Sequence, residues 1–265
     1  MADLSGIYKE FEGDLHRVEH LLRLIKGFRE FGASSPPQEL KDATVNWVEA
    51  VSLHTQAGNV RTDLPVLSGS LQLYLSGRFE YFVRQVVEAV AEEIASHVRQ
   101  YSELPENLRQ QLRALTLEVV QAPRRYGYDE AEADSLLAQF VAVFSGATPP
   151  TEIGAEVLSL TDSNMKDRIL ADLMKRVGMS DFWREVGKQA PVKMFLNKAT
   201  DGETTAAAQS RLNQIMEERN QIAHPTADTQ FPDPDKVLSH VEFLRVLATT
   251  TTLLLTVYLR AGRTG

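Results

Sequence analysis

The stretch Arg219-Asn220-Gln221-Ile222-Ala223-His224, followed at once by Pro225, ends a well-formed amphipathic helix in this 265-residue chain. Proline cannot continue a helix, so the histidine stands where helical geometry breaks and its ring can project. Residues four apart share a helix face, which places Asn220 beside His224, whereas the long side chain of Arg219 must curl round to join them. An arginine and a histidine brought together can stabilise a phosphate and move a proton without a metal.

Helical periodicity of apolar residues dominates the rest of the chain, and convincing strand alternation is absent. Residues 200–205 are polar and are expected to precede the helix that carries the motif. We expect helices over residues 4–31, 38–54, 68–101, 106–120, 129–144, 166–177, 181–186 and 206–223, and a last helix that begins at Pro234 behind the N-cap Asp233. The pattern predicts an all-α protein.

Composition excludes several classes of protein. The chain contains no cysteine, so it has neither a disulfide framework nor a cysteine-based zinc site. Among the scattered histidines, only His16 and His20 have a paired spacing, and we expect them to be ordinary surface residues rather than metal ligands. Phosphate-binding glycine loops, serine-hydrolase elbows and His-Glu-x-x-His zinc helices are absent as well. We therefore expect neither a metal nor an organic cofactor.

The most apolar stretch, residues 246–259, is shorter than the roughly twenty residues that a membrane span needs. It also contains four consecutive threonines, and it is interpreted as a buried core helix. Residues 1–11 include Asp3, Lys9 and Glu10, which a signal peptide of the usual apolar type does not tolerate. We expect a cytoplasmic protein that does not enter a membrane.

The charge of the chain is unevenly distributed. The net charge of −8 argues against a broad basic surface for non-specific nucleic-acid binding, but residues 161–198 hold eight basic side chains against five acidic ones. This segment could hold an RNA backbone, and the alternative is an ordinary solvated helix face. In the loop 121–128, Arg124 and Arg125 stand beside Tyr126 and Tyr128, and arginines beside aromatic residues can stack RNA bases. The alternative there is that the tyrosines simply pack onto the domain.

The motif resembles the Arg-x4–6-His signature of the HEPN superfamily, in the form with asparagine after the arginine and an aliphatic-Ala-His ending. Two further stretches carry the resemblance. Ser163-Asn164-Met165 through Val177-Gly178-Met179 is similar to the segment that precedes the signature in prokaryotic members. Ser70 to Val90, with Phe79-Glu80-Tyr81-Phe82, resembles their early helix, in which a glutamate stands between large aromatic residues.

The resemblance spans residues 64–259, and it divides the chain into a HEPN-like helical domain, 61–265, and an N-terminal helical extension, 1–60. It implies an up-and-down helical bundle that forms a homodimer, so that two Arg-His pairs face one cleft. In many members this cleft is the site of a metal-independent endoribonuclease. The resemblance therefore implies RNA as the substrate, and a toxin or antiviral effector with an antitoxin or defence-system partner.

The resemblance implies catalysis by Arg219 and His224, with support from Asn220. Chemistry agrees, because cleavage of RNA through its 2′-OH uses one base and one acid, and a symmetric dimer supplies two copies of a single suitable histidine. There are two departures: Pro225 stands where many relatives have glycine, and Thr226 where one toxin branch has a modifiable tyrosine. The alternatives are a non-catalytic HEPN-like dimerisation or RNA-binding module, or a structural helical protein in which the motif is coincidental.

Overall fold

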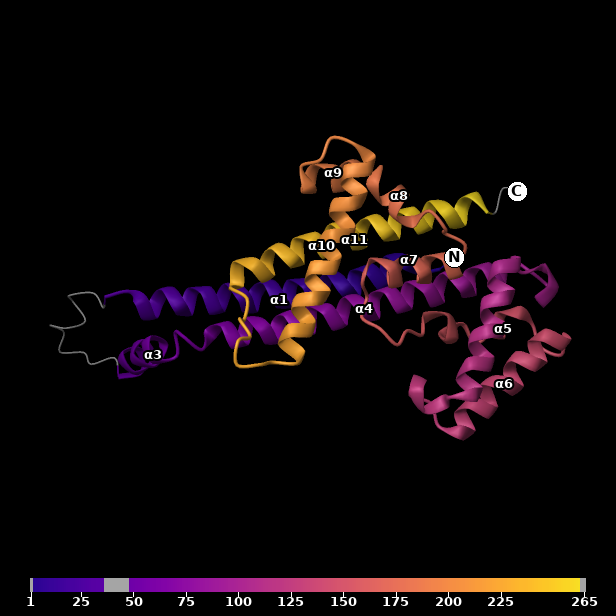
Figure 1. Cartoon of the computed structure of the whole chain (residues 1–265), viewed down its shortest axis with the longest axis horizontal. Coiled ribbons are helices and arrows are strands. Elements are labelled where there is room, and N and C mark those ends of the chain that lie inside the picture. Colours follow the sequence, from indigo (N-terminus) through magenta and orange to yellow (C-terminus); the bar gives the residue numbers. More distant parts are fainter. Residues whose placement is uncertain (1, 36–47, 263–265) are drawn as a thin grey trace.

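The computed structural model describes residues 2–35 and 48–262, and within those ranges it contains helices and turns but no strand (Figure 1). The all-α prediction is confirmed. The beginning of the helix expected over 38–54 lies outside the described residues. The α-helices are, in chain order, α1 (Leu4–Ala33), α3 (Val48–Asn59), α4 (Leu64–Ser96), α5 (Glu106–Gln121), α6 (Glu130–Ser145), α7 (Asp167–Arg176), α8 (Phe182–Gly187), α9 (Ala190–Leu196), α10 (Asp201–Ala223) and α11 (Pro234–Ala261).

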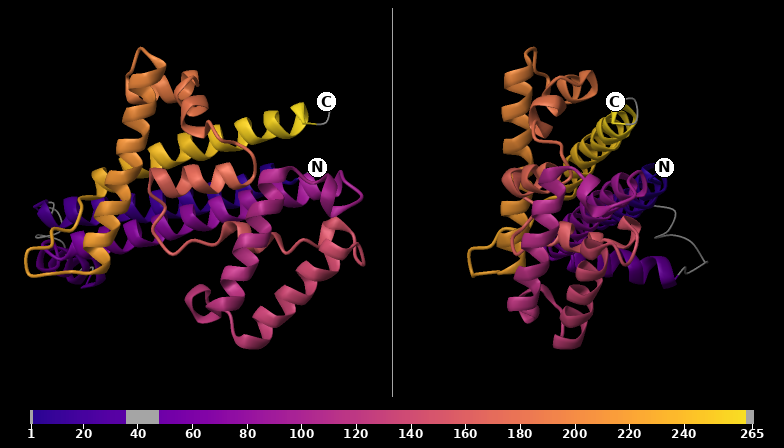
Figure 2. Two further views of the ribbon diagram at one scale, coloured as in Figure 1. Left: turned by 45° about the vertical axis from the view of Figure 1, so that its right-hand side comes forward. Right: turned by 90° about the vertical axis from the view of Figure 1, so that its right-hand side faces the viewer.

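Three long helices, α1, α4 and α11, pack together along the length of the molecule, with α1 running opposite to the other two (Figures 1 and 2). Their apolar residues recur every three or four positions and therefore face one core. The ring of Phe11 on α1 lies 5.0 Å from that of Phe82 and 5.9 Å from that of Phe79, centroid to centroid. α1 thus shares its core with α4 and α11, and the domain boundary at residue 60 stays a prediction.

The threonine run in α11 does not interrupt that helix. β-Branched residues disfavour helix, but the hydroxyls of Thr249, Thr251 and Thr252 each donate to the carbonyl four residues upstream, at 2.8–2.9 Å. By length and composition α11 could also cross a membrane, and it is the one such helix among the described residues. In the fold, 44% of its most apolar stretch is buried, and the helix packs against α1 and α4.

α10 crosses α4 and α11 at a steep angle, while α8 and α9 cover its amino-terminal half (Figures 1 and 2). It begins at Asp201, so the expected start at residue 206 is wrong. Thr200 forms a capping box with Glu203: the backbone N–H of Glu203 donates to the Thr200 hydroxyl, and the Thr200 N–H to the Glu203 carboxylate, both at 3.3 Å. The end of α10 at Ala223 agrees with the stop expected from Pro225.

Candidate active site

A polar hollow of about 1020 Å³ lies where α4, the loop before α7 and the end of α10 meet. Arg219, Asn220 and His224 all line it, so the fold brings the three predicted site residues to one place. Asn213 lines it from an earlier turn of α10. The hollow is therefore built mainly on rigid helices, which hold the motif residues in fixed positions.

Asn220 is the centre of the hydrogen bonding at the motif. Its Oδ1 accepts a hydrogen bond from Nη1 of Arg219 at 3.3 Å and another from the side-chain amide of Asn164, in the loop before α7. The helical spacing places Asn220 beside His224, but the Asn220 side chain does not bond that histidine. Instead its oxygen fastens the Arg219 guanidinium to the facing loop, which explains how an arginine on another side of the helix joins the motif.

His224 caps the carboxyl end of α10. Its backbone N–H donates to the carbonyl of Asn220 at 3.1 Å, and its dihedral angles, φ −125° and ψ 67°, leave the helical region as the following Pro225 requires. The side chain is exposed and, in the part of the chain that the structure describes, makes no hydrogen bond or ion pair. Its imidazole is thus accessible from solvent.

The chain that follows His224 returns across the beginning of α4. Gly69 is buried there, and a Cβ at this position would lie 2.5 Å from the ring of Phe231 and 3.4 Å from Ile222. Only glycine lets α4 approach both the last turn of α10 and the returning loop. Gly69 therefore helps to fix the direction in which the chain leaves the motif.

The loop before α7 is attached to both other walls of the hollow. The first N–H of α7, at Asp167, donates to Oδ1 of Asn213 at 2.9 Å, and the N–H of Met165 donates to Glu80 at 3.4 Å. Lys166 forms an ion pair with Glu217 of α10 at 2.6 Å. The segment that resembles the one preceding the HEPN signature thus packs directly against the motif helix.

The basic segment 161–198 contributes less to the hollow than its charge indicated. Of its eight basic residues, only Lys166 and Arg168 line the hollow. Arg176 is directed inward instead, where its Nη1 donates to the carbonyls of Leu158 and Leu160, and burial lowers the pKa of its guanidinium. The segment is therefore not one continuous basic surface facing the motif.

Arg125 and Tyr126 bond to acidic side chains within the fold. Arg125 forms ion pairs with Asp162 and with Glu118, and the hydrogen bond from Arg125 holds the pKa of the Asp162 carboxyl below its usual range. The Tyr126 hydroxyl donates to Glu118, which raises the pKa of the phenol. Tyr128 packs against the hydrophobic core. These contacts agree with the alternative in which the side chains of this loop pack onto the domain, rather than with side chains that are free to stack on RNA bases.

Sequence reasoning did not single out Arg84 and Glu80 as site residues, and both line the hollow from α4. They lie four residues apart, and Glu88 continues the same spacing, so the three share one face of the helix. A polar stripe on a helix that is otherwise rich in valine and phenylalanine is a signal that could have indicated them. The sequence alone does not say which element that stripe faces.

A second polar cluster lies on the other side of α10, inside the core. His240 of α11 is fully buried, and its Nδ1 is 2.8 Å from Oε1 of Gln72 on α4. Its Nε2 lies 3.6 Å from the carboxylate of Glu218, which also binds Lys236 at 2.9 Å. Desolvation lowers the pKa of His240 to about 4, although Glu218 opposes this effect. His240 is thus a neutral structural histidine.

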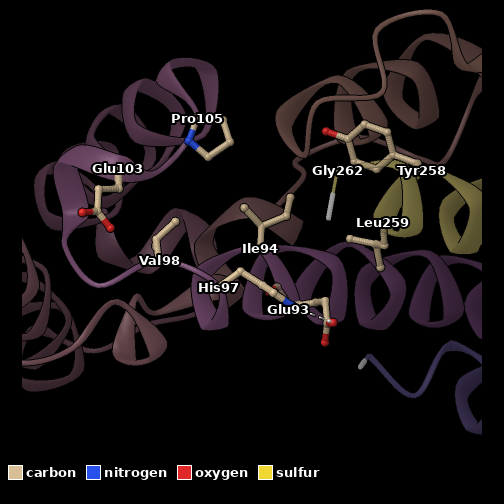
Figure 3. A pocket seen from close by; sticks show the side chains of 9 residues that line it. All are labelled: Glu93, Ile94, His97, Val98, Glu103, Pro105, Tyr258, Leu259 and Gly262. Carbon is tan, nitrogen blue, oxygen red and sulfur yellow. Dashed lines mark hydrogen bonds and ion pairs between the residues drawn. The ribbon is translucent and has the colours of Figure 1, made fainter. Parts of the chain in front are cut away.

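A second hollow, of about 300 Å³, lies between the ends of α4 and α11 and the start of α5 (Figure 3). Ile94, Val98 and Leu259 give it a largely apolar wall, and Nε2 of His97 is 3.8 Å from the Glu93 carboxylate. No arginine or lysine occurs among the described residues that line it. It therefore lacks the cationic groups that the hollow at the motif provides.

The fold and the hollow define an all-α protein in which an arginine and a histidine line one polar hollow. The sequence model of the RiboL-PSP-HEPN family matches residues 48–256, more than half of the chain, so the protein belongs to this family. No curated protein and no solved structure matches the chain. Membership of the HEPN superfamily suggests a nuclease-like or RNA-related function.

Proposed function

We propose that this protein is a metal-independent endoribonuclease whose active site is the hollow at the end of α10. The observation that supports this most is that Arg219, Asn220 and His224 line one polar hollow from the last turns of a single helix. The Arg219 guanidinium is held by a hydrogen bond to Asn220 while the His224 imidazole is exposed, so one group is positioned and the other is open to a substrate.

In the proposed reaction the 2′-oxygen of a ribose attacks the adjacent phosphorus and the P–O5′ bond breaks, leaving a 2′,3′-cyclic phosphate and a 5′-OH. His224 accepts the proton of the attacking 2′-OH, and a second histidine donates a proton to the departing 5′-oxygen. Arg219 donates hydrogen bonds to the phosphate oxygens, where negative charge accumulates in the transition state. Asn220 acts through Arg219 as a positioning residue.

One chain does not supply both histidines. Among the described residues that line the hollow, His224 is the one histidine. We therefore propose a symmetric homodimer in which the partner's His224 completes the site. Each protomer would then contribute one proton-transfer group to a shared cleft.

The proposal includes a biological setting. An RNase with a composite site is suited to act as a toxin or antiviral effector, since any condition that separates the protomers also stops cleavage. We accordingly propose a cytoplasmic protein that acts on RNA without entering a membrane. Its controlling partner would be an antitoxin or defence-system protein.

A second candidate function is a non-catalytic HEPN-like module for dimerisation or RNA binding. The observation that favours it is the acidic side chains at the hollow, where Glu80 and Asp167 accompany the cations, in a chain of net charge −8. Such groups weaken the attraction of a phosphate backbone. In this case Arg219 and His224 would only stabilise the helix end and the interface.

The two functions are separated by incubating purified protein with a mixed RNA pool in EDTA and identifying the new ends by mass spectrometry. We expect cyclic phosphate and 5′-OH ends, and a loss of roughly 10²- to 10⁴-fold in His224→Ala and Arg219→Ala. His20→Ala is the matched control, because His20 is exposed on α1 and does not line the hollow. RNA that is bound but never cut by the parent protein would support the non-catalytic module.

The composite site is tested by mixing parent and His224→Ala chains, dissociated and allowed to re-pair. If each cleft needs both histidines, an equal mixture retains about one quarter of the parent activity, because only that fraction of randomly formed dimers has two parent chains. Retention of about one half would mean that each protomer acts alone. Size-exclusion chromatography of the mixture checks that pairing has occurred.

A further inference from the structure

Three arginines face the hollow without a carboxylate partner. Among the described residues, Arg84, Arg168 and Arg219 each line the hollow and form no ion pair within 4.0 Å. Lys166, which also lines it, is neutralised by Glu217. Guanidinium groups that lack an internal counter-charge are available to an anionic ligand, and their planar forks match phosphate oxygens.

Arg84 is the most constrained of the three. It projects from α4 between Val83 and Val86, which are buried at 1% and 0% exposure, so its backbone is fixed in the core. Its Nε is buried and has no hydrogen-bond partner, and Nη2 reaches only the hydroxyl of Thr161, at 3.5 Å. A buried guanidinium N–H without an acceptor is costly. The terminal N–H groups of Arg84, rather than the buried Nε, are those that a phosphate oxygen entering the hollow would meet.

The carboxylates near Arg84 are engaged elsewhere. Glu80 accepts the N–H of Met165, and Asp162 is paired with Arg125. Glu88, four residues beyond Arg84, accepts a hydrogen bond from the hydroxyl of Ser159, and burial raises the pKa of its carboxyl. The charge of Arg84 opposes this rise in the pKa of Glu88, but no carboxylate among the described residues lies within 4.0 Å of the guanidinium. A close ionic contact for Arg84 must therefore come from a ligand.

We propose that Arg84 binds a phosphate of the RNA next to the one that is cleaved, and so positions the strand across the hollow from α4 to α10. The inference rests on the proposed function, in which Arg219 holds the scissile phosphate. Arg84 lines the hollow from α4 and Arg219 lines it from α10, and no hydrogen bond between described residues joins Arg84 to the motif. A substrate with two or more phosphodiesters would engage both walls, whereas a dinucleoside monophosphate would engage only one.

Binding is measured with a short RNA that is 2′-O-methylated throughout and so cannot be cleaved, at several salt concentrations. We expect Arg84→Gln to weaken binding about tenfold at low salt. The slope of log K against log salt should decrease by about 0.7, the contribution of one phosphate contact to a single strand. Arg84→Lys should retain most of the salt slope, because it keeps the positive charge. It should lose part of the affinity, because it lacks the planar guanidinium that donates two hydrogen bonds to a phosphate.

Cleavage distinguishes a positioning role from a structural one. With a hexanucleotide, Arg84→Gln should raise KM about tenfold while kcat changes little, and with a dinucleoside monophosphate the variant and the parent protein should be equal. Arg23→Gln is the matched control, since Arg23 is exposed on α1 and forms no ion pair among the described residues. Thermal melting of both variants checks that the fold is retained.

The outcomes separate this inference from the function on which it rests. Unchanged affinity and salt slope in Arg84→Gln, with the parent protein binding and cutting RNA normally, would overturn the role of Arg84 alone. An equal loss on the hexanucleotide and the dinucleoside would overturn it as well, because it would indicate a general effect on the site. A parent protein that neither binds nor cuts RNA would overturn both proposals.

Discussion

The two sides of α10 hold histidines in opposite environments. His224, at the end of the helix, is exposed beside an arginine and, among the described residues, has no side-chain partner. His240 is fully buried on the other side, held between Gln72 and Glu218. Both side chains are imidazoles, yet only that of His224 is open to a substrate.

The comparison shows that burial, rather than residue type, determines which histidine can meet a substrate and which one supports the core. Gln72, whose oxygen accepts from His240, also donates from its side-chain amide to the carbonyl of Ile215 on α10 at 3.5 Å, one turn before Arg219. The buried side thereby determines the orientation of the open side. Loss of a buried hydrogen-bond partner leaves a polar group unsatisfied, so damage on this side should affect stability, while damage at the motif should affect activity.

The largest effect should come from substituting the exposed histidine. His224→Gln should lower kcat/KM for RNA by roughly 10²- to 10⁴-fold, because a proton-transfer group is lost. The midpoint of thermal unfolding should hardly change, since the side chain has no partner to lose within the described structure. Activity and thermal melting of the variant and the parent protein are measured in parallel. A marked loss of stability in the variant would contradict the distinction between an exposed side of α10 that serves activity and a buried side that serves stability.

A smaller effect, on stability, should follow when the pH is lowered and His240 on the buried side of α10 must be protonated. The folded pKa of His240, about 4, is lower than the ordinary histidine pKa of 6.5, so between these pH values the unfolded chain binds one more proton than the folded one. Stability should therefore fall as pH decreases from 6.5 towards 4, by at most about 3 kcal/mol from this group.

Urea denaturation across that pH range measures the effect. The informative quantity is the difference between the parent protein and His240→Gln, which cancels the contributions of other titrating groups. The variant should lose this part of the pH dependence. Identical slopes in the two proteins would contradict a depressed pKa at His240.

The smallest effect should come from removing one partner from the buried network. Gln72→Met keeps the approximate volume but leaves the Nδ1 of His240 without its acceptor, at a cost of about 1 to 3 kcal/mol. The matched control is Gln85→Met on the same helix, where the amide bonds only the exposed Tyr81 hydroxyl, and it should cost less than about 0.5 kcal/mol. Both free energies of unfolding are measured by urea denaturation. Equal losses in the two variants would show that the hydrogen bond between Gln72 and His240 does not contribute to stability.

Local chemistry predicted most helix positions. The expected helix over 4–31 is observed as α1, Leu4–Ala33, and the expected helix over 129–144 as α6, Glu130–Ser145, whose N-cap is Asp129. The errors have local causes too. α4 begins at Leu64 rather than at residue 68, because Pro65 fits the first turn of a helix. α10 begins at Asp201 rather than at residue 206, because Thr200 and Glu203 form a capping box. The short helix α9 was not predicted. Asp233 precedes α11 as expected, but its carboxylate pairs with Arg29 and makes no capping hydrogen bond to the helix.

The sequence by itself determined the all-α class, the end of α10 and the motif that belongs to the HEPN superfamily. Each depends on residues within a few positions of one another, where helical spacing and proline act directly. The tertiary structure alone decided that Asn164 fastens Asn220, that Arg84 and Arg219 line one hollow, and that His240 is buried while His224 is not. These relations join residues far apart in the chain, and only the packing of α4, α10 and α11 brings them together.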